Sequence, residues 1–323
     1  MSAPELSVVI LAAGYGTRMK SDQPKVMHAI ARRPMIGHVV ATVAPLSPAR
    51  AAVVVGPEMG VVIDAARAAA PGLPIVRVEQ RERKGTGHAV AQARQALAGA
   101  HGDVAVLYGD VPLLQTATVA RAMTARRDGG HAVTVIGMRP LDPGAYGRMV
   151  VGPDGLLERI VEAADADEAT RAITLCNSGL MVVDATILFA LLDRLSNDNA
   201  KGEYYLTDIV GEARALGRNC SVVEAAADEL TGVNSRSELA AAERILQMRL
   251  RLAAMAGGAT MVDPDTVWLS YDTKIGRDVE IGPAVSFGPG VVVGDGARIG
   301  SFCHLESVHV PAGATVDPGT RSL

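Results

Sequence analysis

Short apolar runs and amphipathic segments alternate over the first 235 residues. Each apolar run is bounded by glycine, proline or polar residues, which predicts buried strands at 8–11, 51–55, 75–78, 104–108 and 132–138. Between these runs, apolar positions with helical spacing predict helices at 35–43, 61–70 and 88–97. Strands that alternate with helices of about ten residues indicate an α/β fold with a doubly wound sheet. Ligands of such sheets bind beyond the carboxyl ends of the strands.

The pattern changes at residue 236, where a long helix is predicted to Met255. Its apolar positions form one stripe, at 239, 242, 246, 250 and 253, and Gly257 and Gly258 end it. Ser235 and Glu238 fit a capping box at its start. We interpret residues 236–258 as a linker helix between a first domain, 1–235, and a last domain, 259–323.

The last domain repeats with a period of six. Large apolar residues recur at 275, 281, 287, 293, 299 and 305, and glycine follows each of the first five. Small or β-branched residues stand four places after them, at 279, 285, 291, 297 and 303. This is the hexapeptide repeat of a left-handed parallel β-helix, with about three hexapeptides per coil. The phase slips near His309, because Val310 comes five residues after Leu305.

Composition excludes several classes of protein. The 323 residues carry a net charge of −4, which argues against general binding to nucleic acid or to membrane surfaces. There is no apolar run of membrane-spanning length and no signal-peptide pattern at the start. The three cysteines are far apart and form no metal-binding spacing with the seven histidines. We therefore expect a cytoplasmic protein without disulfides or zinc.

Residues 7–25 carry the strongest chemical signal. A buried strand runs into a turn with Gly14 and Gly16, whose backbone can approach an anion closely, and Arg18 and Lys25 follow. Arginine can fork onto phosphate oxygens, whereas lysine supplies a mobile point charge. The spacing is neither that of a P-loop nor that of a Rossmann dinucleotide site.

Several polar residues later in the chain have a structural interpretation and, in some cases, a ligand-binding interpretation as well. Thr86 could cap the following helix, or the Gly85-Thr86 loop with Gln80 could lie against a nucleobase. Asp110 could form a turn before Pro112 or bind a metal ion at the carboxyl end of the strand. Asn177, inside the apolar run 173–183, could bond to backbone or to a ligand. Thr207 and Asp208 also fit a helix cap, and Asn234 fits a loop that feeds the next helix.

The string L-A-A-G-x-G-T-R-M at 11–19, followed by Pro24-Lys25-Val26-Met27-His28, resembles the signature of the sugar-nucleotide pyrophosphorylases. Among these, it looks most like the N-acetylglucosamine-1-phosphate uridylyltransferases of bacterial bifunctional enzymes. The resemblance implies a Rossmann-like nucleotidyltransferase domain with a mixed, mostly parallel sheet. It also implies roles for individual residues. The catalytic pair is Arg18 and Lys25. The nucleotide-binding residues are Leu11, Ala12, Ala13, Gly14, Gln80, Gly85 and Thr86. The substrate-binding residues are Tyr108, Gly109, Gly147, Glu162, Asn177, Tyr205 and Thr207. The Mg²⁺ ligands are Asp110 and Asn234.

The resemblance further implies the reaction of UTP with N-acetyl-α-D-glucosamine 1-phosphate, and a homotrimer formed through the β-helix. The family has a longer β-helix with an acetyltransferase site, whose coils this sequence does not contain. We therefore expect no acetyl transfer, and we expect His304 and His309 to be ordinary outward positions. Three alternatives stay open: a nucleotidyltransferase for another sugar or base, a non-catalytic nucleotide sensor, and a β-helix acyltransferase.

Overall fold

A computed structural model of the protein describes residues 5–322, which form two compact units. The first unit runs to Met27 and continues over Met35–Asn234. The second consists of His28–Pro34 and the chain from Ser235 onward. Within residues 5–322, no helix combines the length and the apolar character that crossing a membrane would require.

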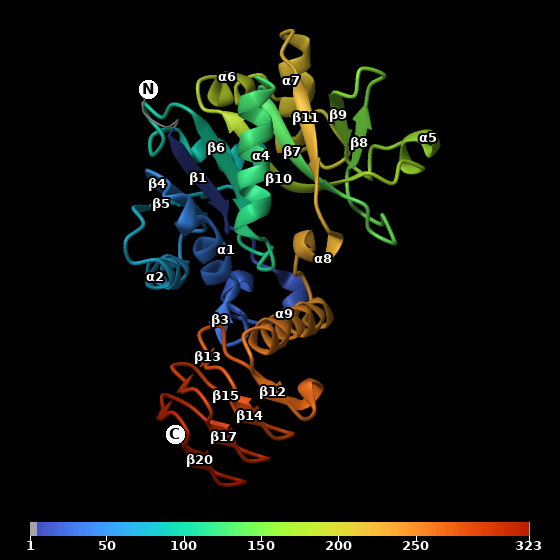
Figure 1. The fold of residues 1–323 in the computed structure, drawn as a ribbon. Coiled ribbons are helices and arrows are strands. Elements are labelled where there is room, and N and C mark those ends of the chain that lie inside the picture. The colour runs from blue at the N-terminus through green and yellow to red at the C-terminus, as the bar shows by residue number, and fades with distance from the viewer. Residues whose placement is uncertain (1–4, 323) are drawn as a thin grey trace. The chain divides into compact units, whose positions relative to one another are not determined.

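The first unit is built on a sheet of mixed direction (Figure 1). Its strand order is β11-β7-β10-β6-β1-β4-β5. The bounds of these strands are β1 Leu6–Leu11, β4 Arg50–Val55, β5 Ile75–Glu79, β6 Asp103–Tyr108, β7 Val133–Met138, β10 Cys176–Asp184 and β11 Cys220–Glu224. Only β10 runs antiparallel to its neighbours on this path, β6 and β7. The remaining strands, β8 (Arg148–Val151) and β9 (Leu157–Val161), form an antiparallel pair that joins the sheet through β10. The expected mixed, mostly parallel sheet is confirmed.

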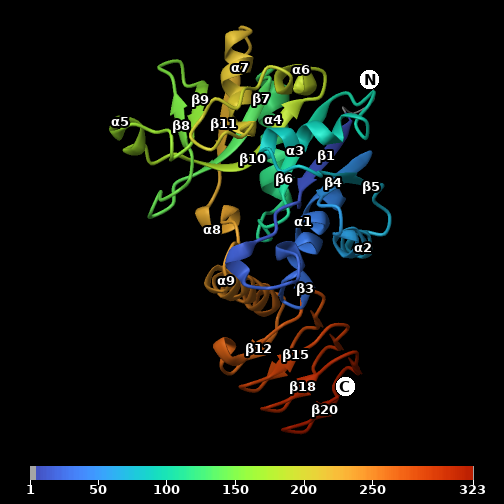
Figure 2. The same cartoon turned by 180° about the vertical axis from the view of Figure 1, so that it is seen from behind.

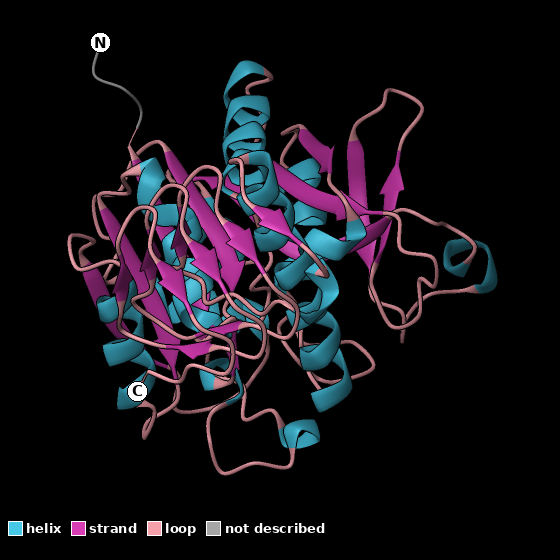
Figure 3. Cartoon of the chain, turned by 60° about the horizontal axis from the view of Figure 1, so that its bottom comes forward, coloured by secondary structure: helices cyan, strands magenta, loops and turns pink. Residues whose placement is uncertain are grey.

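Helices cover both faces of this sheet, because alternate side chains of each strand point to opposite sides. Val8 and Ile10 of β1 pack with one set of helices: α1 (Met35–Val43), α2 (Gly60–Ala69) and α4 (Thr116–Asp128). Val9 packs with the other set: α3 (Thr86–Ala91), α6 (Leu188–Leu192) and α7 (Ile209–Ala215). Figures 1 and 2 show α4 on one side of the strands and α3 on the other. The short helices α5 (Glu168–Arg171) and α8 (Ala227–Leu230) complete the helices of the unit (Figure 1). Figure 3 shows the helices and strands of the chain in separate colours.

The predicted helix at 88–97 is shorter than expected. The α-helix spans Thr86–Ala91, and a 3-10 turn at Gln92–Arg94 follows it. The Gln92 side chain donates to the carbonyl oxygen of His88 at 3.1 Å, within the turn where the helix tightens. Tightening of the last turn into 3-10 geometry is a common end for an α-helix.

The long segment of the second unit begins with α9 (Arg236–Ala256), whose predicted capping box is present at Ser235 and Glu238. Against α9 lies a short hairpin of β2 (Ala29–Ile30) and β3 (Arg33–Pro34), in which the Ala31 N–H donates to the Glu243 carboxylate at 2.7 Å. The predicted apolar stripe of α9 is only partly buried. Gln247, which lies outside that stripe, is 2% exposed, because its amide pairs with both backbone groups of Leu269.

The rest of the second unit is a parallel β-helix with three stacks of two-residue strands. The first stack contains β12 (Thr260–Met261), β14 (Glu280–Ile281), β17 (Arg298–Ile299) and β20 (Thr315–Val316). The others contain β13 (Lys274–Ile275), β16 (Val292–Val293) and β19 (His309–Val310), and β15 (Ser286–Phe287) and β18 (His304–Leu305). Glu280 pairs with Arg298, so one coil takes three hexapeptides. Arg298 pairs with Thr315, one residue fewer, which confirms the predicted phase slip.

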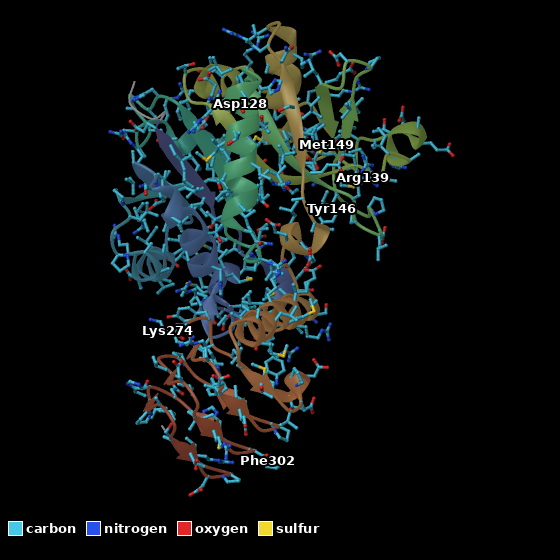
Figure 4. All side chains as sticks on the ribbon, viewed as in Figure 1. Asp128, Arg139, Tyr146, Met149, Lys274 and Phe302 are labelled. Atoms are coloured by element: carbon cyan, nitrogen blue, oxygen red, sulfur yellow. The ribbon has the colours of Figure 1, made fainter. Side chains whose placement is uncertain are left out.

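Close stacking of the coils explains the repeated glycines. A Cβ atom added to Gly300 would lie 2.5 Å from the backbone nitrogen of Pro318 on the next coil. Phe302, by contrast, occupies a left-handed corner with φ 63° and is 69% exposed (Figure 4). His309 is exposed and His304 is partly exposed, as the repeat predicts.

Candidate active site

The glycine turn and the Pro-Lys motif form one structural element. Beyond β1, the Ala12 N–H donates to the carbonyl oxygen of Val54 at 2.8 Å, which fixes the start of the turn. Gly16 has φ +66°, and a Cβ atom there would lie 2.5 Å from the Cβ atom of Lys25. Glycine at this position therefore lets the Lys25 segment pack against the turn, so the glycine turn and the Pro-Lys motif depend on each other for their positions.

Lys25 brings the two predicted metal ligands together. Its ammonium donates to the Asp110 carboxylate and to the Oδ1 atom of Asn234, the latter at 2.9 Å. Asp110 lies two residues beyond the end of β6, and its carbonyl oxygen accepts the N–H of Val233 at 2.8 Å. This backbone bond holds Asn234 beside Asp110, although 124 positions separate them in the numbering. The Lys25 and Asp110 side chains are only 12% and 14% exposed.

Asp110 and Asn234 fit a divalent cation. Their oxygen atoms converge on one position, which the Lys25 ammonium takes here as a stand-in cation. Carboxylate and amide oxygens are the hard ligands that Mg²⁺ prefers, and Mg²⁺ keeps several waters, so two protein ligands suffice. Residues 5–322 contain no group of three or more histidine, cysteine, aspartate or glutamate side chains suited to a metal ion. That finding is compatible with a site made of one carboxylate and one amide.

A cavity of about 270 Å³ lies beside these residues. Its lining contains every residue predicted to bind the nucleotide: Leu11, Ala12, Ala13, Gly14, Gln80, Gly85 and Thr86. Lys25, Tyr108 and Asp110 line it as well. The carboxyl ends of β1, β5 and β6 thus contribute to one cavity, as the topology of the sheet predicts.

The Gly85-Thr86 loop is shaped by a distant segment rather than by helix capping. Gly85 has φ +107° and occupies the N-cap of α3, and a Cβ atom there would lie 2.5 Å from the Tyr204 carbonyl oxygen. The Thr86 hydroxyl accepts the N–H of Leu206 at 3.0 Å. The interpretation of Thr86 as the cap is therefore wrong. Gln80 is buried, and its amide donates to the Gly85 carbonyl oxygen at 3.3 Å.

Further backbone bonds join residues 203–207 to this loop. The Tyr204 N–H donates to the Lys84 carbonyl oxygen, and the Tyr204 carbonyl oxygen accepts the N–H of Gly87, both at 2.8 Å. Glu203 lines the cavity. The buried side chains of Tyr205 and Thr207 therefore belong to a segment that is fixed against the Gly85-Thr86 loop.

A second cluster contains the residues predicted to bind the sugar. The Thr207 hydroxyl donates to the Glu162 carboxylate at 3.1 Å. Burial raises the pKa of Glu162, and the Thr207 hydrogen bond opposes this shift. Thr207 and Asp208 provide no side-chain cap for the helices that begin there, so the capping interpretation is wrong for this pair too.

Asn177 is held by backbone groups. Its N–H donates to the Gly147 carbonyl oxygen at 2.8 Å, and its Oδ1 atom accepts the N–H of Gly179 at 2.9 Å. Gly179 lies in a bulge of β10, where a Cβ atom would come 2.8 Å from the Tyr108 ring. The backbone-bonding interpretation of Asn177 is confirmed for its oxygen atom. Tyr108 in turn contacts this bulge and lines the 270 Å³ cavity, so it connects the two clusters.

Some residues lie elsewhere or were not predicted. Arg18 is exposed in a 3-10 turn, Thr17–Met19, and does not line the cavity. Gly109 is buried between β6 and Asp110. Arg83 and Glu203 also line the cavity, although no motif in the sequence marks them. Arg83 belongs to a run of five charged and polar residues after β5, whose individual directions the sequence does not reveal.

Two family models define the class of protein to which each unit of the chain corresponds. Residues 8–179 match the family model "MobA-like NTP transferase domain", and residues 272–307 match "Bacterial transferase hexapeptide (six repeats)". The first unit is thus a nucleotidyltransferase domain, as predicted. Family membership also points to a divalent metal requirement.

Relatives narrow the class to one family. The chain is 54% identical over 322 residues to "Bifunctional protein GlmU" of Paramagnetospirillum magneticum, covering 99% of this chain and 70% of that protein. It is 58% identical over 310 residues to the protein of the same name from Rhodospirillum rubrum, covering 96% and 68%. The chain belongs to the GlmU family.

Solved structures agree on the fold. A UDP-glucose pyrophosphorylase complexed with UDP-glucose has a TM-score of 0.60 at 18% identity, covering 76% of this chain and 99% of that chain. A putative glucose-1-phosphate thymidylyltransferase from Bacillus anthracis has a TM-score of 0.59 at 18% identity, covering 74% and 94%. At such identities, the likeness shows a shared architecture only.

Proposed function

We propose that the protein makes UDP-N-acetylglucosamine and pyrophosphate from UTP and N-acetyl-α-D-glucosamine 1-phosphate. Membership of the GlmU family and the nucleotidyltransferase domain support this activity. One structural observation carries the proposal. Lys25, Asp110 and Asn234 meet at a cavity that the glycine turn lines.

The nucleotide would occupy the 270 Å³ cavity. Gln80 and the Gly85-Thr86 loop would contact the base, because an amide and backbone groups can match the donors and acceptors on its edge. Residues 11–14 would lie along the nucleotide, where Gly14 offers exposed backbone without a Cβ atom.

The sugar phosphate would bind between Tyr108 and the cluster around Glu162. A partly buried carboxylate and a buried amide suit the hydroxyl and N-acetyl groups of the sugar, and Glu162 and Asn177 supply them. Tyr205 and Thr207 would line the sugar site next to Glu162. Gly147 and Gly109 would contribute backbone on this side, although the space beside Gly109 is filled by the Val26 and Ile36 side chains.

The chemistry needs positioning and positive charge rather than a base. The phosphate oxygen of the sugar phosphate attacks the α-phosphorus of UTP in line, and pyrophosphate leaves with the electrons of the broken P–O bond. Lys25 would stabilise the charge that develops on the transferred phosphate, and Arg18 would hold the triphosphate tail. The flexible stem of Lys25 allows its ammonium to leave Asp110 for a phosphate.

Asp110 and Asn234 would hold Mg²⁺ in this proposal. When bound, the ion would neutralise negative charge on the reacting phosphates. The neutral amide of Asn234 keeps the net negative charge of the protein ligands low, which favours entry of a triphosphate.

The hexapeptide repeats suggest oligomerisation, and we propose a homotrimer formed through the β-helix. We also propose that 1–235 act as the catalytic domain and that 236–258 connect it to the β-helix of 259–323. A cytoplasmic location would fit substrates that are cytoplasmic metabolites.

The proposal is tested by pyrophosphate release from UTP, with N-acetylglucosamine 1-phosphate and glucose 1-phosphate compared side by side, with and without Mg²⁺. We expect Mg²⁺-dependent release that strongly favours the acetamido sugar. Preference for glucose 1-phosphate would overturn the sugar assignment. UTP binding without release from either sugar would instead indicate a nucleotide sensor.

A further inference from the structure

An arginine joins the two loops that line the nucleotide cavity. Arg83 lies on the loop after β5, and its Nε atom donates to the Ala13 carbonyl oxygen at 2.9 Å. Its guanidinium carbon lies 3.2 Å from the centroid of the Tyr15 ring. Ala13 and Tyr15 flank Gly14 on the loop after β1. The Arg83 side chain therefore holds this loop on both sides of Gly14.

The path of this side chain crosses a third strand. β4 lies between β1 and β5 in the sheet, and Gly56 directly follows β4. A Cβ atom added to Gly56 would lie 3.3 Å from the Nη2 atom of Arg83, closer than ordinary side-chain contact. Gly56 thus leaves space for the guanidinium to pass. The Arg83 side chain spans the carboxyl ends of three parallel strands, where ligands of this fold bind.

The hydrogen bond to Ala13 also orients Gly14. The Ala13 carbonyl and the Gly14 N–H belong to one planar peptide group and point in opposite directions. Within residues 5–322, this N–H has no hydrogen-bond acceptor, and Gly14 is exposed and lines the cavity. Because glycine has wide backbone freedom, a tether on this peptide determines where its N–H points.

We propose that Arg83 and Tyr15 are positioning residues that set the Gly14 peptide for binding of the nucleoside triphosphate. The tyrosine ring orients the guanidinium, and the guanidinium holds the Ala13 carbonyl. This inference rests on the proposed function of the cavity. Tyr15 is 61% exposed and contributes no buried core, so its removal leaves the fold intact.

The test is UTP binding by isothermal titration calorimetry without sugar phosphate, together with steady-state kinetics. Tyr15→Ala should weaken UTP binding about two- to fivefold, the value of a cation–π contact at an exposed site. Arg83→Ala should weaken it about tenfold, because a charge-assisted hydrogen bond is lost as well. The rate at saturating UTP should change less than about twofold, since the tether acts on binding.

Two variants separate the tether from general effects. Tyr15→Phe keeps the aromatic ring and should bind UTP like the unaltered protein. Arg81→Ala removes a positive charge from the same loop, but Arg81 is 84% exposed and pairs with Glu79, so UTP affinity should stay unchanged. Equal losses from Arg81→Ala and Arg83→Ala would overturn the proposal in favour of a general charge effect.

The double variant gives the sharpest result. If the two residues act as one unit, Tyr15→Ala should cost nothing further in the Arg83→Ala background. Full additivity would overturn the proposal. A loss with Arg83→Ala but none with Tyr15→Ala would also overturn it and indicate that Arg83 contacts the nucleotide directly. If the unaltered protein fails to bind UTP, the proposed function itself falls, which is a distinct outcome.

Discussion

The two units bury polar side chains in different ways. Around the cavity of the first unit, Lys25 pairs with Asp110 and Asn234, and Thr207 pairs with Glu162. In the second unit, the buried amide of Gln247 pairs with both backbone groups of Leu269, and its nitrogen also donates to Glu243 at 2.8 Å. Side chains that pair with one another beside a cavity can exchange these partners for a ligand. A side chain that pairs with backbone fixes the path of the chain.

This difference predicts a separation between residues that serve catalysis and residues that serve folding. Substitutions at the cavity of the first unit should alter catalysis with little effect on folding. Substitutions in the core of the β-helix should alter folding, while each folded molecule keeps its turnover number. The following predictions test this separation, in order of decreasing expected effect.

The largest effect is expected for Phe287→Ala in the β-helix. Phe287 is 1% exposed, so its removal should lower the free energy of unfolding of this unit by about 3–5 kcal/mol. The only tryptophan, Trp268, lies in the same unit, so its fluorescence during urea denaturation reports on it selectively. Phe302→Ala is the matched control, because Phe302 is 69% exposed and its loss should cost less than about 0.5 kcal/mol. A large fall in turnover of the folded Phe287→Ala protein would contradict the separation.

Asp110→Ala should lower turnover about a hundredfold or more, equivalent to about 3 kcal/mol of transition-state stabilisation. Asp103 offers a matched control, since it begins the strand that Asp110 follows. Asp103 is buried and pairs with Arg126 and Arg127. Asp103→Asn should therefore lower stability but leave the turnover of folded protein near normal. Turnover within a few-fold of normal for Asp110→Ala would refute its assignment as a metal ligand.

Glu162→Gln should raise the KM for the sugar phosphate about tenfold, because hydrogen bonds to a charged acceptor are the stronger ones. The KM for UTP should not change. Glu158→Gln, on the strand β9 that ends just before Glu162 but with a side chain that is 39% exposed, should leave both constants unchanged. Initial-rate kinetics with each substrate varied in turn would measure this. A rise in the KM for UTP alone would place Glu162 on the nucleotide side.

The smallest effect concerns Asp208. Burial, followed by the charges of Glu162, Asp165 and Glu212, raises its pKa to about 6. An unfolded aspartate has a pKa of about 3.9, so the folded protein binds more protons between about pH 4 and 6. Stability therefore falls as the pH rises through this window. The Asp208→Asn protein should not lose stability over this window. Its free energy of unfolding should be about 1 kcal/mol higher than that of the unaltered protein at pH 7.5 and equal to it at pH 4.

Circular dichroism during urea denaturation at the two pH values would measure the Asp208 effect. Trp268 fluorescence should show no change, because this residue lies in the other unit. An equal gain in stability at both pH values would mean that the substitution acts through packing rather than through charge.

The sequence could predict what depends on periodicity and on local motifs. The six-residue repeat specified the β-helix and its phase slip, and the family resemblance carried by the glycine-turn motif selected seven of the residues that line the cavity. It could not predict contacts that depend on strand order. The sheet places only β4 between β1 and β5, so the Arg83 side chain can reach Ala13 across the end of β4. From the sequence, Thr86 looked like a helix cap. Its hydroxyl instead accepts the N–H of Leu206, which is 120 positions away and cannot be found from local sequence. Gln247 is buried although it lies outside the predicted stripe, because its amide pairs with the backbone of Leu269, a segment outside its own helix.

The short hairpin at His28–Pro34 has a consequence for synthesis. It emerges from the ribosome near the start of the chain, yet it belongs to a unit whose other residues begin at Ser235. At about 5–20 residues per second, some 200 residues take about 10–40 s to follow. During this interval, Ile30, which is fully buried in the finished protein, has no α9 to pack against. A fragment that ends at Asn234 would keep this hairpin permanently without its partners, so cutting the gene at that point divides the second unit rather than separating it from the first.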